Sequence, residues 1–89
     1  MYEIVFSPRA RREFRKLTSA GQERLAVAID RLRINPRQVG VKKLTQPLYR
    51  IRVGDWRIIY AILDKQSSVV VVKIDRRSKD TYADLDELF

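Results

Sequence analysis

The sequence predicts an α+β fold in which two N-terminal helices pack on one face of a small twisted, mainly antiparallel sheet. Three observations lead to this prediction. Apolar and polar residues alternate through residues 48–60, apolar residues recur at helical spacing between residues 7 and 35, and an apolar run, SSVVVVKID, follows. The expected order is β-α-α-β-β-β with a short C-terminal helix. At 89 residues the chain is expected to form one domain, residues 1–89, with a modest core.

The opening segment is expected to form a strand followed by a helix. Alternating apolar side chains predict the strand over residues 2–6. Ser7 then supplies an N-cap and Pro8 a first helical residue. Polar residues of this helix, Glu13 among them, are expected in solvent. Its apolar residues share one face: Ala10, Phe14 and Leu17.

A second helix is expected after the break at residues 18–21. Ser19 and Gln22 have the spacing of a capping box at its start. Its end is expected near Asn35, because Pro36 disfavours helical geometry in the residue before it. The apolar residues of this helix again follow helical spacing: Leu25, Ala28, Ile29 and Leu32.

A loop and a hairpin come next. Residues 36–47, with two prolines and a glycine, are expected to form a loop that carries Lys42 and Lys43. The alternating runs that follow are separated by Gly54 and Asp55, and glycine at the first central position fits a type II′ turn. A two-residue turn fixes the register, which pairs Val53 with Trp56, Arg52 with Arg57, Ile51 with Ile58 and Tyr49 with Tyr60.

This register sorts the hairpin side chains onto two faces. One face is apolar and is expected under the helices: Tyr49, Ile51, Val53, Trp56, Ile58 and Tyr60. The other face gathers Arg50, Arg52 and Arg57. Like charges directly opposite each other destabilise a hairpin, so this face requires a compensating anion.

The last strand can supply only part of that compensation. With a loop at residues 65–67, Lys73 and Asp75 join the arginine face, and Asp75 lies opposite Arg57. One carboxylate leaves a large surplus of positive charge, and Arg76 and Arg77 follow at once. An anionic ligand is therefore favoured over Asp75 and solvent alone. The same loop places three apolar residues on the core face: Val70, Val72 and Ile74.

Composition and charge narrow the classes of function. The chain has no Cys and no His, which excludes thiolate chemistry and removes the commonest general base and metal ligand, so neither a metal nor a cofactor is expected. Residues 1–79 hold nineteen basic and seven acidic side chains, a net charge of +12. Such a surface attracts polyanions, although basic surfaces also serve solubility alone. Arginines outnumber lysines roughly two to one, which favours phosphate recognition.

The two ends of the chain bear on its location and on the candidate site. No apolar run approaches the ~20 residues of a membrane span, and the N-terminus lacks the features of a signal peptide, so we expect a cytoplasmic protein without membrane contact. The final segment, SKDTYADLDELF, is expected to form a short helix capped by Ser78. Tyr82 in this segment can stack on a base, or equally cover the edge of the core.

Several of these segments together resemble the RelE branch of the RelE/ParE toxin superfamily, the toxin halves of bacterial and archaeal toxin–antitoxin pairs. The strongest is YRIRVGDWRIIYAI, supported by SPRARREFRKL, by KKL ahead of the hairpin and by DRRSKDTY. The resemblance covers essentially the whole chain. It implies a core similar to that of microbial ribonucleases and a ribosome-dependent endoribonuclease activity. Such an enzyme cleaves messenger RNA in the ribosomal A site, by attack of a ribose 2′-hydroxyl on the adjacent phosphate.

The resemblance also implies partners and residue roles. The partners are mRNA on the ribosome and a cognate acidic antitoxin similar to RelB. The basic pair on the second strand falls on Arg50 and Arg52, and the phosphate-binding arginine falls on Arg57. The leaving-group arginine falls on Arg77, with Arg76 as the alternative, and the stacking tyrosine on Tyr82. Further RNA contacts are expected from Lys43, Lys73 and Arg76.

One departure from the family pattern concerns the general base. Where well-studied members have lysines on the second strand, this chain has arginines, which stay protonated and are poor bases. The base is therefore open among Lys43, Lys73, the Tyr82 hydroxyl and groups of the ribosome or substrate.

Two other functions fit the same sequence. A toxin similar to ParE would inhibit DNA gyrase without cleaving RNA. A basic nucleic-acid-binding module would grip phosphates without catalysis. Assays on translating ribosomes and on gyrase separate these alternatives.

Overall fold

The computed structural model describes residues 1–76, which form five strands, two α-helices and one 3-10 turn. In chain order these are β1 (Glu3–Phe6), α1 (Pro8–Arg15), α2 (Ser19–Ile34), β2 (Lys42–Lys43), β3 (Leu48–Val53), β4 (Trp56–Leu63), η1 (Asp64–Gln66) and β5 (Ser68–Arg76). The predicted C-terminal helix, with Arg77 and Tyr82, lies outside the described residues.

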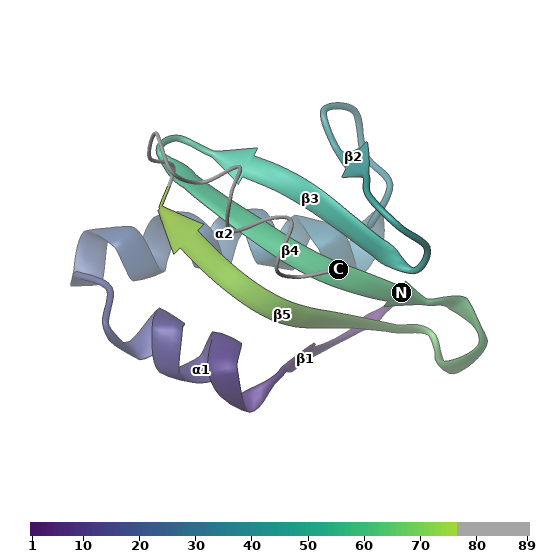
Figure 1. Ribbon diagram of the computed structural model, residues 1–89, viewed down its shortest axis with the longest axis horizontal. Coiled ribbons are helices and arrows are strands. Elements are labelled where there is room, and N and C mark those ends of the chain that lie inside the picture. Colours follow the sequence, from purple (N-terminus) through teal and green to yellow (C-terminus); the bar gives the residue numbers. More distant parts are fainter. Residues whose placement is uncertain (77–89) are drawn as a thin grey trace.

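The strands make one mixed sheet in the order β1-β5-β4-β3-β2 (Figure 1). β1 runs parallel to β5, and the other neighbours are antiparallel. Both helices pack on the same face of this sheet. The predicted α+β class is confirmed, with one addition. Lys42 and Lys43, expected in a loop, form the short edge strand β2 against β3.

Both helices begin at side-chain caps. The Ser7 hydroxyl accepts a hydrogen bond from the Ala10 N–H at 3.1 Å and thereby caps α1, as predicted. The cap of α2 is Thr18, whose hydroxyl accepts from the Gly21 N–H at 3.1 Å. The expected capping box at Ser19 was therefore wrong by one residue, because Ser19 is already helical.

The hairpin of β3 and β4 has the predicted register. Arg52 lies opposite Arg57, and the pairs on either side match as well. Gly54 has a φ of 61°, the left-handed value that the first central residue of a type II′ turn requires. The turn chemistry thus places the arginines of both strands on one face.

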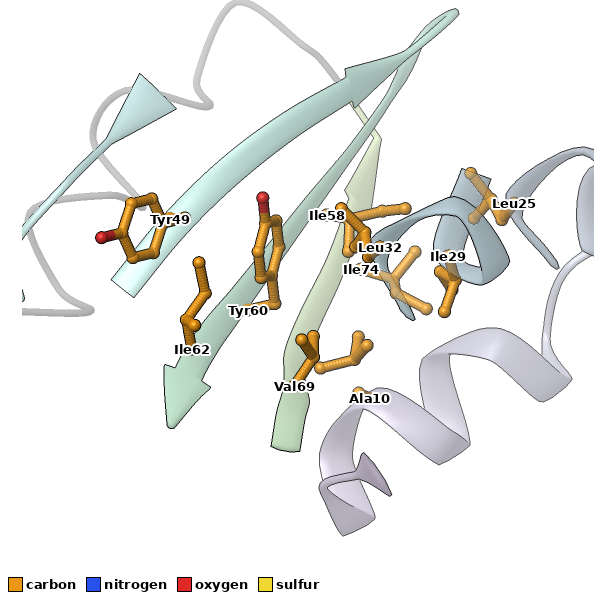
Figure 2. Close-up of a cluster of buried hydrophobic side chains, with 11 residues drawn as sticks. Ala10, Leu25, Ile29, Leu32, Tyr49, Ile58, Tyr60, Ile62, Val69 and Ile74 are labelled. Carbon is orange, nitrogen blue, oxygen red and sulfur yellow. The ribbon is translucent and has the colours of Figure 1, made fainter. Parts of the chain in front are cut away.

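A buried core fills the space between the sheet and the two helices (Figure 2). Tyr60 is the largest of its fully buried side chains, with no exposed surface. Its ring stacks on Tyr49 with the ring centroids 6.1 Å apart, and its hydroxyl donates to the Pro36 carbonyl at 2.7 Å. Burial raises the pKa of the Tyr60 hydroxyl above its ordinary value, so it stays a donor. This contact ties the segment after α2 to the sheet.

A bulge changes which residues of β5 face the core. The register shifts between Ile59 and Tyr60, so that Ile59 pairs with Lys73 but Tyr60 pairs with Val71. Val72 is the extra residue of β5. The core therefore takes Val69 and Val71, which have no exposed surface, instead of the predicted Val70 and Val72. Ile74 lies beyond the bulge and faces the core as predicted.

Helix α1 continues the edge of the sheet where β1 ends. β1 pairs with residues 68–71 of β5, which leaves the outer edge of β5 after Val71 without a strand partner among the described residues. The Glu13 carboxylate accepts a hydrogen bond from the Ile74 N–H at 3.0 Å on this edge. Glu13 was expected in solvent, and the structure corrects this expectation. Neither helix in residues 1–76 has the length and apolar character needed to cross a membrane.

Candidate anion-binding site on the sheet

Two neighbouring rungs of the sheet carry basic side chains on the face opposite the helices. Cross-strand partners place their side chains on the same face of a sheet. In the first rung, Arg50 pairs with Ile59 on β4, and Ile59 pairs with Lys73 on β5. In the second, Arg57 stands between Arg52 and Asp75. These residues are called the basic face: Arg50, Arg52, Arg57, Ile59, Lys73 and Asp75.

Three cations of the basic face are buried. Arg57 is 3% exposed, Lys73 6% and Arg50 8%, whereas Arg52 is exposed. Ile59, between Arg50 and Lys73 in the rung, has no exposed surface and forms an apolar floor. Charged side chains are seldom buried unless they are paired, because burial removes them from water. The basic face therefore holds positive charge in a setting where an anion is bound more strongly than at an exposed surface.

Asp75 partly compensates this charge. The Arg57 Nη2 atom lies 2.9 Å from the Asp75 Oδ2 atom and donates a hydrogen bond to it. The Lys73 Nζ atom lies 3.5 Å from the same oxygen. The Arg57 Nε atom is buried and has no hydrogen-bond partner among the described residues. Two buried cations thus share a single carboxylate oxygen, and one guanidinium donor stays unsatisfied.

The structure brings together four of the predicted site residues and separates two others from them. Arg50, Arg52, Arg57 and Lys73 share the basic face. Lys43 pairs with Tyr49 and so lies on the helix side of the sheet, whereas Lys42 pairs with Arg50. Arg76 pairs with Trp56 and places its guanidinium carbon 5.8 Å from the centroid of the indole ring. The roles of these residues stay predictions.

Sequence reasoning missed Ile59, which belongs to the basic face, and Lys42, which is the cross-strand neighbour of Arg50. Lys42 was assigned to a loop, and nothing in the pair Lys42 and Lys43 says which one would share the face of Arg50. Ile59 was not assigned to the site, although the alternation that places Ile58 in the core also places Ile59 beside the arginines. The signal for Ile59 was present in the sequence, and that for Lys42 was not.

A second polar cluster lies beyond the opposite end of β4. The Asp64 carboxylate accepts two hydrogen bonds from Arg37, at 3.2 and 2.8 Å, and one from the Tyr2 hydroxyl at 2.7 Å. Arg37, and then Tyr2, hold the pKa of the Asp64 carboxyl below its ordinary value of 3.8. The Arg37 guanidinium carbon also lies 5.5 Å from the centroid of the Tyr49 ring. This cluster ties the N-terminus to the segments after α2 and β4, and all its charges are already paired.

Within residues 1–76, no group of three or more His, Cys, Asp or Glu side chains could hold a metal ion. The chemistry that the basic face supports is electrostatic: fixed guanidinium and ammonium groups stabilise negative charge on a bound group. The described residues offer no imidazole or thiol that could serve as an acid or base.

The fold and the site define a class of protein, a small α+β domain with a partly buried cationic site on its sheet. A family model, described as the ParE toxin of the type II toxin–antitoxin system parDE, matches residues 4–81. The chain belongs to this family of the RelE/ParE superfamily and is a toxin of the type II toxin–antitoxin class.

Solved structures of RelE toxins have the same fold. The isolated E. coli RelE toxin matches with a TM-score of 0.79 and 24% identity, and all of both chains is covered. A chain of the intact E. coli RelBE toxin–antitoxin complex matches with a TM-score of 0.78 and 26% identity, over 89% of this chain and 100% of that one. For the RelBE2 complex of Mycobacterium tuberculosis the values are 0.75 and 26%, over 85% and 98%. Comparison with curated protein sequences finds no match.

Proposed function

We propose that this toxin is a ribosome-dependent endoribonuclease that cleaves mRNA in the ribosomal A site. The ribose 2′-hydroxyl of the message loses its proton and attacks the adjacent phosphate, and the basic face stabilises the charge that accumulates on the pentavalent phosphate. The bond from phosphorus to the 5′-oxygen of the next nucleotide then breaks, which leaves a 2′,3′-cyclic phosphate and a protonated 5′-hydroxyl. The observation that carries the proposal is the pair of rungs in which Arg50, Arg57 and Lys73 are buried, and in which Arg57 and Lys73 share one carboxylate oxygen, that of Asp75. Donors fixed in advance stabilise a transition state more than a mobile ground state.

In this proposal the role of each cation follows from how exposed its side chain is. Arg57 is buried and held, which suits a donor to a phosphate oxygen that must stay in place. Arg52 is exposed and suits attraction of the RNA backbone. Arg77 and Tyr82 are proposed to complete the site, as leaving-group arginine and stacking ring.

Removal of the proton from the 2′-hydroxyl is the step for which this chain offers the weakest catalytic groups. Of the two candidate lysines, Lys73 lies on the basic face beside Asp75, and Lys43 lies on the other face. A chain without His depends strongly on a substrate held in the reactive geometry, which the ribosome provides. We therefore expect efficient cleavage of message on ribosomes and little cleavage of free RNA.

A second function, gyrase inhibition of the ParE kind, is favoured by the description of the matching family model. It would use the same fold without nuclease chemistry. In either case the partner is an antitoxin. The E. coli and M. tuberculosis structures of toxin–antitoxin complexes, each 26% identical, support this inference.

One experiment separates the two functions. Purified toxin is added to programmed ribosomes, to the same message without ribosomes, and to a gyrase supercoiling assay. Arg57→Ala is compared with the wild type, and Arg12→Ala, an exposed arginine of α1, is the matched control. We expect cleavage on ribosomes alone, lost in Arg57→Ala and kept in Arg12→Ala, with circular dichroism confirming that both variants fold. Inhibition of supercoiling without cleavage would replace the proposal by the ParE function.

A further inference from the structure

Asp75 is placed to do more than neutralise charge. It forms an ion pair with Arg57 and another with Lys73, and both pairs end at the same atom, Oδ2. Its side chain is 22% exposed, so it lies near the boundary between the buried cations and solvent. An oxygen shared by Arg57 and Lys73 keeps these two groups directed towards one position.

The contact between Asp75 and Arg57 leaves one buried donor of the guanidinium unused. A guanidinium donates through several N–H groups in a fixed plane, and a carboxylate commonly takes two of them in parallel. Here Asp75 takes one hydrogen bond from Nη2, and the buried Nε has no partner in the described residues. A buried donor without an acceptor is unfavourable, and an oxyanion that reached it would satisfy it. A contact formed for stability alone would be expected to use this donor as well.

We propose that Asp75 is a positioning residue. It holds the Arg57 guanidinium through Nη2 and leaves the Nε–H to a non-bridging phosphate oxygen of the substrate. Asp75 itself does not touch the reacting atoms. This inference rests on the proposed ribonuclease function for its substrate, but the anion subsite at Arg57 can be tested without any cleavage.

The first test observes the guanidinium directly. The Nε–H signal of Arg57 is followed by ¹⁵N NMR while inorganic phosphate is added to the wild type, to Asp75→Asn and to Asp30→Asn. Asn has nearly the size of Asp but lacks the charge, and Asp30 pairs with Arg33 on the exposed side of α2, so it is a matched control. We expect a phosphate-dependent shift of the Arg57 signal in the wild type and in Asp30→Asn. In Asp75→Asn we expect a broadened signal with a smaller shift.

The second test separates position from charge. Asp75→Glu keeps the negative charge but moves the carboxylate by one methylene. If Asp75 only neutralises the positive charge of the basic face, this variant cleaves message at the rate of the wild type. If it positions Arg57, kcat on ribosomes falls roughly 10- to 100-fold in both Asp75→Glu and Asp75→Asn, while KM changes little. Thermal denaturation checks that each variant is folded, and Asp75→Glu alone suffices should Asp75→Asn not fold.

The outcomes distinguish this inference from the function on which it rests. An Arg57 signal that does not respond to phosphate in the wild type, or full cleavage by Asp75→Glu, overturns the positioning role. A response in the wild type that is reduced or lost in Asp75→Asn supports it even if the protein cleaves no message. Absence of cleavage would overturn the ribonuclease proposal and leave Asp75 as the residue that orients an anion-binding arginine.

Discussion

At the scale of single residues, Arg52 and Arg57 show that two arginines of one alternating pattern can have different surroundings. They are direct cross-strand partners on the same face, yet Arg57 is buried and Arg52 is exposed. The ion pair of Arg57 with Asp75 removes part of the repulsion between the two arginines. The two positions should therefore differ in how far they depend on the shape of the guanidinium.

Lysine substitutions test this difference. Arg57→Lys keeps the charge but loses the planar fork, so we expect cleavage on ribosomes to fall about 10²- to 10³-fold, the range for loss of a fixed donor. Arg52→Lys should keep most of the activity, because an exposed cation acts mainly as a point charge. Single-turnover rates measure both variants. Equal losses would mean that the basic face acts through general electrostatics and not through oriented donors.

The interactions of Asp64 predict how the stability of the protein depends on pH. Its folded-state pKa is depressed by Arg37 and Tyr2, so its contribution to stability is fully present above the ordinary value of 3.8 and is lost as the pH falls through the lower folded value. Asp64→Asn should therefore lower the melting temperature at pH 7, and the difference from the wild type should shrink below a pH of about 3.8. Melting curves measured between pH 2 and pH 7 check this. A difference that stays constant with pH would show that the carboxylate charge is not involved.

At the scale of elements, α1 has a role that its sequence did not indicate. The Glu13 carboxylate satisfies the Ile74 N–H on the edge of β5, and the Ser7 hydroxyl donates to the Val72 carbonyl at 3.2 Å. An edge without partners exposes backbone groups that favour pairing with other chains. Helix α1 therefore substitutes for a strand along the part of β5 that leads to Lys73 and Asp75.

Removing the Glu13 side chain should weaken this edge. Glu13→Ala leaves the Ile74 N–H without its acceptor, and we expect a loss of about 1–3 kcal/mol in the free energy of unfolding. Amide exchange at Ile74 should also become faster. Glu23→Ala, at an exposed position of α2, is the control and should change stability by less than about 0.5 kcal/mol. Unchanged exchange at Ile74 in Glu13→Ala would mean that the hydrogen bond does not protect this edge.

At the scale of the whole molecule, the net positive charge favours binding of acidic partners. The chain carries a formal charge of +8, and residues 1–79 carry +12. A toxin with such a surface is expected to be inhibited by an acidic segment that covers its cations. Association of this kind is fast at low ionic strength and weakens as salt screens the charges.

Expression in a bacterial host tests the toxin as a whole. We expect production of the chain alone to arrest growth, and co-production of the acidic protein encoded beside its gene to restore it. Arg57→Ala should be harmless in the same host. The affinity of the purified pair should fall between 0.1 and 1 M salt, where the screening length drops from about 10 to about 3 Å. Harmless expression of the wild type, with no binding to the neighbouring product, would contradict the toxin function.

The elements that depend on local chemistry could be predicted from the sequence. Ser7 and Pro8 start α1, Pro36 ends the preceding helix, and the Gly54–Asp55 turn sets the hairpin register. That register was enough to place Arg50, Arg52 and Arg57 on one face and to bring Asp75 opposite Arg57. Each of these features follows from a few neighbouring residues, because turn geometry and side-chain alternation act over short distances.

Packing between distant segments sets the features that local patterns leave open. The bulge at Val72 exchanged the faces of Val69 and Val70, because alternation along a strand cannot show where an extra residue is inserted. The pairing of β2 with β3 put Lys42 beside Arg50, and it depends on where a loop with two prolines returns to the sheet edge. The burial of Arg57, its single hydrogen bond to Asp75 and the contact of Glu13 with β5 arise from packing between segments far apart in the chain. Such contacts are fixed only when the whole core closes, since each depends on the position of elements that the local sequence does not encode.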